Sequence, residues 1–125
     1  MRALIVDDSS TMRSVLRVIV RGLGIETLEA AHGVQAMERL RHSPKIDFAL
    51  VDWNMPEMNG FEFLCALRKN HDHDDLKVVM VTTETELSQV QHALECGANE
   101  YIMKPFTRDS VIEKLQMLAL VPQVA

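Results

Sequence analysis

A short apolar run, Phe48–Val51, ends abruptly in the carboxylate of Asp52 and is followed by polar and turn-forming residues. Because successive positions of the run are apolar, both of its faces are suited to burial, which is typical of a strand in the middle of a parallel sheet. Open α/β sheets bind their ligands at the carboxyl ends of their strands. The run therefore predicts that Asp52 lies where such a sheet carries its chemistry.

Two further strand candidates have the same design, an apolar run that leads into side chains with oxygen atoms. They are Ala3–Val6, followed by Asp7 and Asp8, and Val78–Val81, followed by Thr82 and Thr83. If the three strands are parallel neighbours, three carboxylates and two hydroxyls meet at one edge of the sheet. Such a set of oxygen atoms suits a magnesium ion and a phosphoryl group.

Strand and helix patterns alternate along the chain, which predicts an α/β protein of five βα units with a parallel sheet covered on both faces. We expect one domain over residues 1–125, with the three-layer, doubly wound, flavodoxin-like (βα)5 fold and strand order 2-1-3-4-5. The order comes from the fold class, because periodicity alone does not specify it. The expected strands are 3–7, 26–30, 47–51, 77–81 and 101–103, and helical spacing places Val15, Val34, Leu87 and Leu94 on buried helix faces.

The composition limits the classes of partner. With 13 basic and 18 acidic residues and no basic block, the net charge of −5 argues against nucleic-acid binding. No apolar run approaches the ~20 residues that span a bilayer, and the N-terminus is too soon acidic for a signal peptide, so we expect a cytoplasmic protein with no membrane partner. Cys65 and Cys96 fall inside expected helices as small buried residues, and we expect no disulfide in a reducing compartment.

Three clustered carboxylates raise one another's pKa unless a cation lies among them. Mg²⁺ fits better than Ca²⁺ because few protein oxygens are offered, and the predicted fold brings no His or Cys close by for Zn²⁺. Lys104 follows the last strand on the same side and can pair with a phosphoryl oxygen, and Thr82 offers a hydroxyl. These residues predict phosphoryl transfer to Asp52, an ionised carboxylate that needs no general base.

The same residues carry a resemblance to a known family. The chain resembles response-regulator receiver domains, and most of all the single-domain chemotaxis regulators of the CheY type. The resemblance extends over nearly the whole chain, in the order and spacing of that family. The matching residues are Asp7-Asp8, Asp52-Trp53-Asn54-Met55-Pro56 with Gly60, Val81-Thr82, and Tyr101 with Lys104-Pro105-Phe106.

The resemblance implies a metal site and a phosphoacceptor. Asp52 accepts the phosphoryl group and, with Lys104, carries the catalysis. Asp8, Asp52 and the backbone carbonyl of Asn54 bind Mg²⁺, for which Mn²⁺ can substitute, and Asp7 acts through water. The metal is thus expected to be held by oxygen atoms alone.

The resemblance also implies how the phosphoryl group is bound and read. Thr82 places its hydroxyl on the phosphoryl group, Lys104 pairs with it, and the backbone of Thr83 contributes to its binding. The bond between Lys104 and Pro105 is expected to be cis. Tyr101 is the aromatic switch residue, which turns inward when Thr82 moves.

Two further positions are implied to tune the lifetime of the modification. Asn54 and Glu84 lie two residues beyond Asp52 and Thr82, where the family sets its rate of self-dephosphorylation. Thr83 departs from the family pattern, because a smaller residue is usual there. The bulkier side chain narrows the access of water or donor, which leaves the rate open.

The implied function is a phosphorylation-controlled signalling switch of a two-component His-Asp phosphorelay. A histidine kinase supplies the phosphoryl group, and the surface made by the fourth helix, fifth strand and fifth helix changes its affinity for a downstream protein, such as a flagellar motor switch or a signalling enzyme. We expect a monomeric phosphoacceptor protein rather than an enzyme, with autophosphorylation from small donors and autodephosphorylation.

Two alternatives stay open at this point. A magnesium-dependent phosphatase of the haloacid-dehalogenase type also uses an Asp nucleophile, but such enzymes carry Asp-x-Asp after the first strand and a long cap insertion, neither of which is present in this sequence. A degenerate receiver that serves only for protein contacts is the other alternative. The complete set of site residues argues against it.

Overall fold

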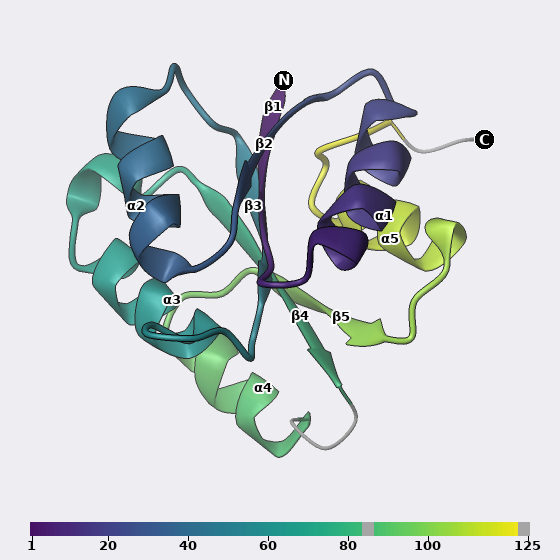
Figure 1. The fold of residues 1–125 in the computed structure, drawn as a ribbon. Helices are drawn as coiled ribbons and strands as arrows, with labels where there is room; N and C mark the ends of the chain where they lie inside the picture. Colours follow the sequence, from purple (N-terminus) through teal and green to yellow (C-terminus); the bar gives the residue numbers. More distant parts are fainter. Residues whose placement is uncertain (84–86, 123–125) are drawn as a thin grey trace.

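The computed structural model describes residues 1–83 and 87–122 and forms a three-layer α/β fold around one five-stranded sheet (Figure 1). The strands pair in parallel in the order β2-β1-β3-β4-β5, which confirms the predicted topology. Their bounds are β1 Arg2–Val6, β2 Glu26–Ala30, β3 Phe48–Asp52, β4 Lys77–Thr83 and β5 Glu100–Lys104. Strand β3 lies at the centre and is buried at all of its positions, as its apolar run predicted.

Helices cover both faces of the sheet. Figure 1 shows α2, α3 and α4 on one face and α1 and α5 on the other. Side chains alternate along each strand between the two hydrophobic cores, so that Leu4 and Val6 pack on the first face and Ala3 and Ile5 on the second. The helices are α1 Ser10–Arg21, α2 Gly33–His42, α3 Gly60–Arg68, α4 Leu87–Glu95 and α5 Arg108–Met117, with a short 3₁₀ helix at His71–His73.

Three residues expected on buried helix faces are exposed. Val15 is 44% exposed, Val34 45% and Leu94 36%. Each lies next to a buried residue of its helix, for example Leu16 in α1, and one residue turns a helix by about 100°. The buried face of each helix is therefore narrower than the apolar stripe in the sequence. The side chain of Leu87 lies outside the described part of the structure.

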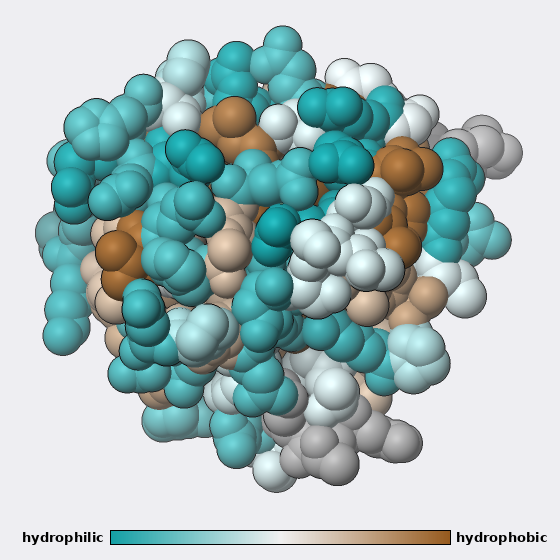
Figure 2. All heavy atoms as spheres, viewed as in Figure 1, coloured by the Kyte–Doolittle hydropathy of each residue, from teal (hydrophilic) through white to brown (hydrophobic). Residues whose placement is uncertain are grey.

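The outer surface is mainly polar. Figure 2 shows hydrophobic residues as small separate areas on a hydrophilic surface, and one of these areas lies over α1. Val15 and Val18, both on α1, are among the exposed large hydrophobic residues. In the part of the chain that the structure describes, no helix combines the length and the apolar composition needed to cross a membrane.

Candidate functional site

The carboxyl ends of β1 and β3 bring three carboxylates together. Val6 is paired with Val51, so Asp7 and Asp52 follow at the same level of two neighbouring strands. One carboxylate oxygen from each of Asp7, Asp8 and Asp52 lies within 4.8 Å of the other two. The sequence-based expectation that these side chains converge is therefore what the structure shows. They meet where the strand order reverses, which is the ligand-binding position of open α/β sheets.

Lys104, the last residue of β5, reaches across the end of β4 into the acidic cluster. Its Nζ donates a hydrogen bond of 2.7 Å to Oδ1 of Asp52 and lies 3.6 Å from Oδ2 of Asp7. The peptide bond between Lys104 and Pro105 is cis, as the resemblance implied. One ammonium group thus faces two buried carboxylates and is the sole lysine or arginine side chain in an ion pair with them among the described residues.

Asp7 offers an oxygen that suits a cation. Its Oδ1 accepts a hydrogen bond from the backbone N–H of Ser9 at 2.9 Å. Its Oδ2 is buried and has no hydrogen-bond partner among the residues described, since Lys104 lies beyond hydrogen-bond distance. A buried carboxylate oxygen that accepts no hydrogen bond and lies beside two other carboxylates is suited to binding Mg²⁺. The residues present therefore fit this ion.

The pKa values of the two buried carboxyl groups, those of Asp7 and Asp52, are raised above their ordinary values. The pKa of Asp52 is raised from 3.8 to about 6, mainly by burial and also by the charges of Asp7 and Asp8, while the hydrogen bond and charge of Lys104 oppose the rise. Burial is also the main cause that raises the pKa of Asp7, against the Ser9 hydrogen bond and Lys104. One lysine thus compensates the cluster only in part, and an added cation would favour the ionised forms.

Lys104 stays protonated in this setting. Burial lowers the pKa of its ammonium group, but the hydrogen bond to Asp52 and the charges of Asp52 and Asp7 outweigh burial and leave the pKa raised. The pair is therefore a charged lysine beside a carboxylate, that of Asp52, whose pKa is about 6. This arrangement supplies both a nucleophile and a fixed positive charge.

Thr82 and Thr83 end the neighbouring strand β4. Val81 is paired with Asp52, so Thr82 lies one residue beyond the level of the phosphoacceptor candidate. Thr82 is buried, and its hydroxyl donates a hydrogen bond of 3.3 Å to the carbonyl of Thr83. Glu84, a predicted rate-tuning residue, lies outside the described residues.

The start of the loop after β3 is held in place by contacts with β4 and α3. Trp53 is buried, its N–H donates to the carbonyl of Val81 at 3.2 Å, and its ring stacks on Phe61. Asn54, the next residue, is exposed. The N–H of Gly60 donates to the carbonyl of Trp53 at 2.9 Å, and a Cβ on this glycine would overlap the backbone oxygen of Asp52. The close approach explains why glycine begins α3 here.

Tyr101 lies on β5, three residues before Lys104, and is half-buried. Its ring packs against the core on the α2–α4 face of the sheet and has the Lys114 ammonium group 4.7 Å from its centroid. A cavity of about 230 Å³ beside it is lined by residues of β5 and α5. The structure thus places Tyr101 on the surface of β5 and α5, outside the acidic cluster.

Two contacts to the site escaped sequence reasoning. The backbone N–H of Ser9 donates to Asp7, and the Ser9 side chain also caps α1 by accepting a hydrogen bond from the N–H of Met12. The guanidinium of Arg13 donates to the backbone oxygen of Asp7 and forms an ion pair with Glu29. A basic residue one turn into the helix after an acidic strand end was the available signal, but solvated arginines have the same pattern.

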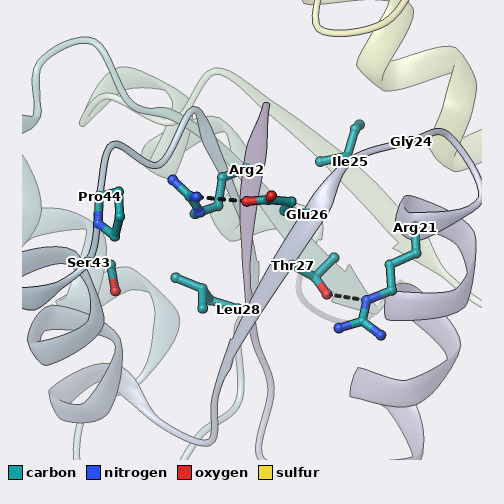
Figure 3. Close-up of a pocket in the computed structure, with 9 residues that line it drawn as sticks. All are labelled: Arg2, Arg21, Gly24, Ile25, Glu26, Thr27, Leu28, Ser43 and Pro44. Atoms are coloured by element: carbon teal, nitrogen blue, oxygen red, sulfur yellow. Dashed lines mark hydrogen bonds and ion pairs between the residues drawn. The ribbon is translucent and has the colours of Figure 1, made fainter.

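Cavity size alone would have pointed elsewhere. A groove of about 610 Å³ lies at the opposite, amino-terminal end of β1 and β2, among residues that include Arg2, Arg21 and Glu26 (Figure 3). Its polar groups are paired with each other, Arg2 with Glu26 and Arg21 with Thr27. The convergence of buried charges therefore identifies the candidate site better than volume does.

Fold and site together define a doubly wound α/β protein with an acidic site at its topological switch point. The family model of the response regulator receiver domain matches residues 3–116. The chain therefore belongs to the receiver-domain family of response regulators, as the resemblance in its sequence predicted.

Its relatives share nearly their whole length with it. A chemotaxis protein CheY homolog of Campylobacter jejuni is 44% identical over 117 residues, which cover 93% of this chain and 90% of that protein. The chemotaxis protein CheY of Pseudomonas aeruginosa is 42% identical over 94% of this chain and 95% of its own. The structure of the chemotaxis protein CheY4 of Vibrio cholerae superposes with a TM-score of 0.85 at 32% identity, covering 93% of this chain and 96% of the other.

Proposed function

We propose that the chain is a single receiver domain in which Asp52 accepts a phosphoryl group and so switches the protein between two signalling states. The observation that carries the proposal is the ion pair between Lys104 and Asp52 at 2.7 Å within a cluster of three carboxylates. A carboxylate nucleophile, a fixed ammonium group and a set of oxygen ligands for a divalent cation are the parts that phosphoryl transfer needs.

The proposed step is a displacement at phosphorus. A carboxylate oxygen of Asp52 attacks the phosphorus atom of the donor and forms an O–P bond, while the bond from phosphorus to the leaving group breaks and its electron pair leaves with that group. The donor is the phosphohistidine of a kinase or a small acyl phosphate. Because Asp52 acts as a carboxylate, the reaction slows as pH falls below its pKa of about 6.

Mg²⁺ would be held by Asp8, Asp52 and the Asn54 carbonyl, with Asp7 acting through water. When bound, the ion supplies positive charge to the phosphoryl oxygens. Lys104 gives a second positive charge and is already in hydrogen-bond contact with the nucleophile. The Thr82 hydroxyl and the Thr83 backbone are proposed to bind the phosphoryl group once it is in place, while Asn54 and Glu84 tune its loss to water.

The proposed output surface is that of α4, β5 and α5. Tyr101 and Lys114 lie together on it, and the Thr82 hydroxyl lies at the end of the neighbouring strand β4. A phosphoryl group that draws Thr82 toward Asp52 would free space for the ring of Tyr101, which biases a two-state surface. The names of the relatives favour a chemotaxis role. A flagellar motor switch or a signalling enzyme is the proposed partner, and the cytoplasm is the proposed location.

The test is intact mass after incubation with acetyl phosphate, with Mg²⁺ and with a chelator in its place. We expect one phosphoryl adduct on the wild type that needs the metal and decays on standing. Asp52→Asn should give no adduct, while the matched control Asp75→Asn, at an exposed acidic residue, should behave as wild type.

The outcomes separate the alternatives. An adduct that persists in Asp52→Asn would overturn the assignment of the phosphoacceptor. No adduct on folded wild type under any condition would identify a degenerate receiver. The family match favours a receiver over a haloacid-dehalogenase-type phosphatase, and turnover of a phosphomonoester, rather than a single labile modification, would reverse that preference.

A further inference from the structure

Helices α3 and α4 cover the same face of the sheet (Figure 1), and two contacts define how they run alongside each other. The ring of Phe61, at the start of α3, stacks on that of His92 with centroids 5.1 Å apart. At the end of α3, Nε of Arg68 donates a hydrogen bond of 3.0 Å to the carbonyl of Gly97. The later residue of α3 thus contacts the later residue of the other segment, so the two segments run side by side in the same direction. The residues between these two contacts therefore face each other.

The two cysteines of the chain occupy that interval. Cys65 lies one helical turn after Phe61, and Cys96 lies four residues after His92, next to Gly97. Cys96 packs against the hydrophobic core on this face, and both cysteines are partly exposed. The pKa of the Cys65 thiol is raised first by burial and then by Cys96, through its charge and a side-chain hydrogen bond. The two flanking contacts therefore bring the cysteines to the same part of the contact between α3 and the end of α4, where both are open to small reagents.

We propose that Cys65 and Cys96 form a reversible oxidation site, a thiol pair that a peroxide closes to a disulfide linking α3 to the end of α4. The inference does not depend on phosphorylation of Asp52, because neither cysteine takes part in the acidic cluster or in its hydrogen bonds. It goes beyond the resemblance to receiver domains, since it rests on two residues and on a helix contact of this chain.

The chemistry balances with hydrogen peroxide as the oxidant. One cysteine loses its proton to give a thiolate, which attacks a peroxide oxygen; the O–O bond breaks, and a sulfenic acid and hydroxide form, the hydroxide taking up the released proton to give water. The thiolate of the other cysteine attacks that sulfur, an S–S bond forms, and the hydroxide that leaves takes up a proton to give a second water. The protein loses two electrons and two protons in all, and a dithiol reductant returns them by thiol–disulfide exchange.

The raised pKa of the Cys65 thiol favours its protonated form, which slows its reaction with peroxide. Closure would tie together residues 31 positions apart and so restrict the unfolded chain. We therefore expect the oxidised protein to melt about 10 °C higher than the reduced protein.

The experiment treats the full chain with hydrogen peroxide and measures intact mass, thiols that react with Ellman's reagent in urea, and the non-reducing peptide map. We expect a loss of two hydrogen atoms in mass, loss of both thiols, and one peptide in which Cys65 is joined to Cys96. The yield should be independent of protein concentration, and dithiothreitol should restore both thiols. Cys65→Ser and Cys96→Ser should each leave one thiol that dimedone traps as a sulfenic acid.

A matched control keeps the number of thiols and changes only their geometry. The double variant C65S/A66C moves one thiol by a single residue, about 100° around α3 and away from Cys96. It should form at least tenfold less intramolecular disulfide than wild type. The proposal is overturned if wild type keeps both thiols under conditions that oxidise free dithiothreitol, if its disulfides are intermolecular and scale with concentration, or if the control closes equally well. Circular dichroism of the reduced variants checks that they fold.

Discussion

The two ends of the parallel sheet differ in how their charged side chains are buried and paired. At the amino-terminal end, Arg2 forms an ion pair with Glu26 at 2.7 Å (Figure 3). The backbone N–H of Arg2 also donates to the carboxylate of Asp47. The Glu26 side chain is 70% exposed and that of Arg2 26% exposed. At the carboxyl-terminal end, Asp7 and Asp52 are buried and share the single ammonium group of Lys104.

The difference shows that the carboxyl-terminal end is not arranged for stability. An exposed ion pair contributes about 0–1 kcal/mol and tolerates change. A buried cluster with more negative than positive charge destabilises the folded state, which is what the raised pKa values of Asp7 and Asp52 express. An arrangement that opposes folding is retained when it serves function, so the contrast supports the proposed site independently of any resemblance.

The largest expected effect comes from removing the one positive charge of the buried cluster. Lys104→Met leaves Asp52 and Asp7 without a counter-charge, so we expect a loss of about 3 kcal/mol in the free energy of unfolding near pH 8. The matched change at the other end, Arg2→Met, should cost less than about 1 kcal/mol because its partner is exposed. Urea denaturation of both variants without metal is the measurement, and equal losses would remove the contrast.

The reverse change should stabilise the protein. Asp52→Asn removes a carboxylate whose pKa rises from 3.8 to about 6 on folding, so at pH 7 the wild type bears a cost that the amide avoids. We expect the variant to be about 1–3 kcal/mol more stable in the absence of metal. The unfolded state ionises first as pH rises, so the difference should be absent below about pH 4 and complete above about pH 6. A variant less stable than wild type at pH 7 would contradict this.

Metal binding should carry the same pH dependence. Mg²⁺ binds the ionised carboxylates, and Asp52 is mostly protonated at pH 5 and mostly ionised at pH 7, so the apparent affinity should be about tenfold higher at pH 7. Titration of Trp53 fluorescence with Mg²⁺ measures it, because this sole tryptophan adjoins Asp52. An affinity that does not change between these pH values would show that Asp52 is not a ligand or does not titrate there.

Sequence reasoning succeeded where one local pattern had one structural outcome. An apolar run that ends in a carboxylate specified both a buried strand and the position of Asp52, and the alternation of elements specified the layers. It failed where the outcome depends on packing between distant segments. Three features depend on how the helices pack on the sheet and on each other. They are the exposure of Val15, the hydrogen bond from Ser9 to Asp7, and the contacts between α3 and the segment of α4 that flank Cys65 and Cys96. Periodicity does not contain that information.

The smallest expected effect comes from the amino-terminal end of the sheet, where the ion pair is exposed. Glu26→Gln removes the charge that faces Arg2 at the amino-terminal end but keeps the shape of the side chain. Because this carboxylate is mostly exposed, water replaces the ion pair, and we expect the free energy of unfolding to change by less than about 0.5 kcal/mol. The measurement is urea denaturation at low and at high salt, since salt screens an exposed pair and should erase even this difference. A loss above about 1 kcal/mol that persists in high salt would show that the groove of Figure 3 also keeps an ion pair shielded from solvent. The two ends of the sheet would then not differ in how strongly their charged groups affect the free energy of unfolding.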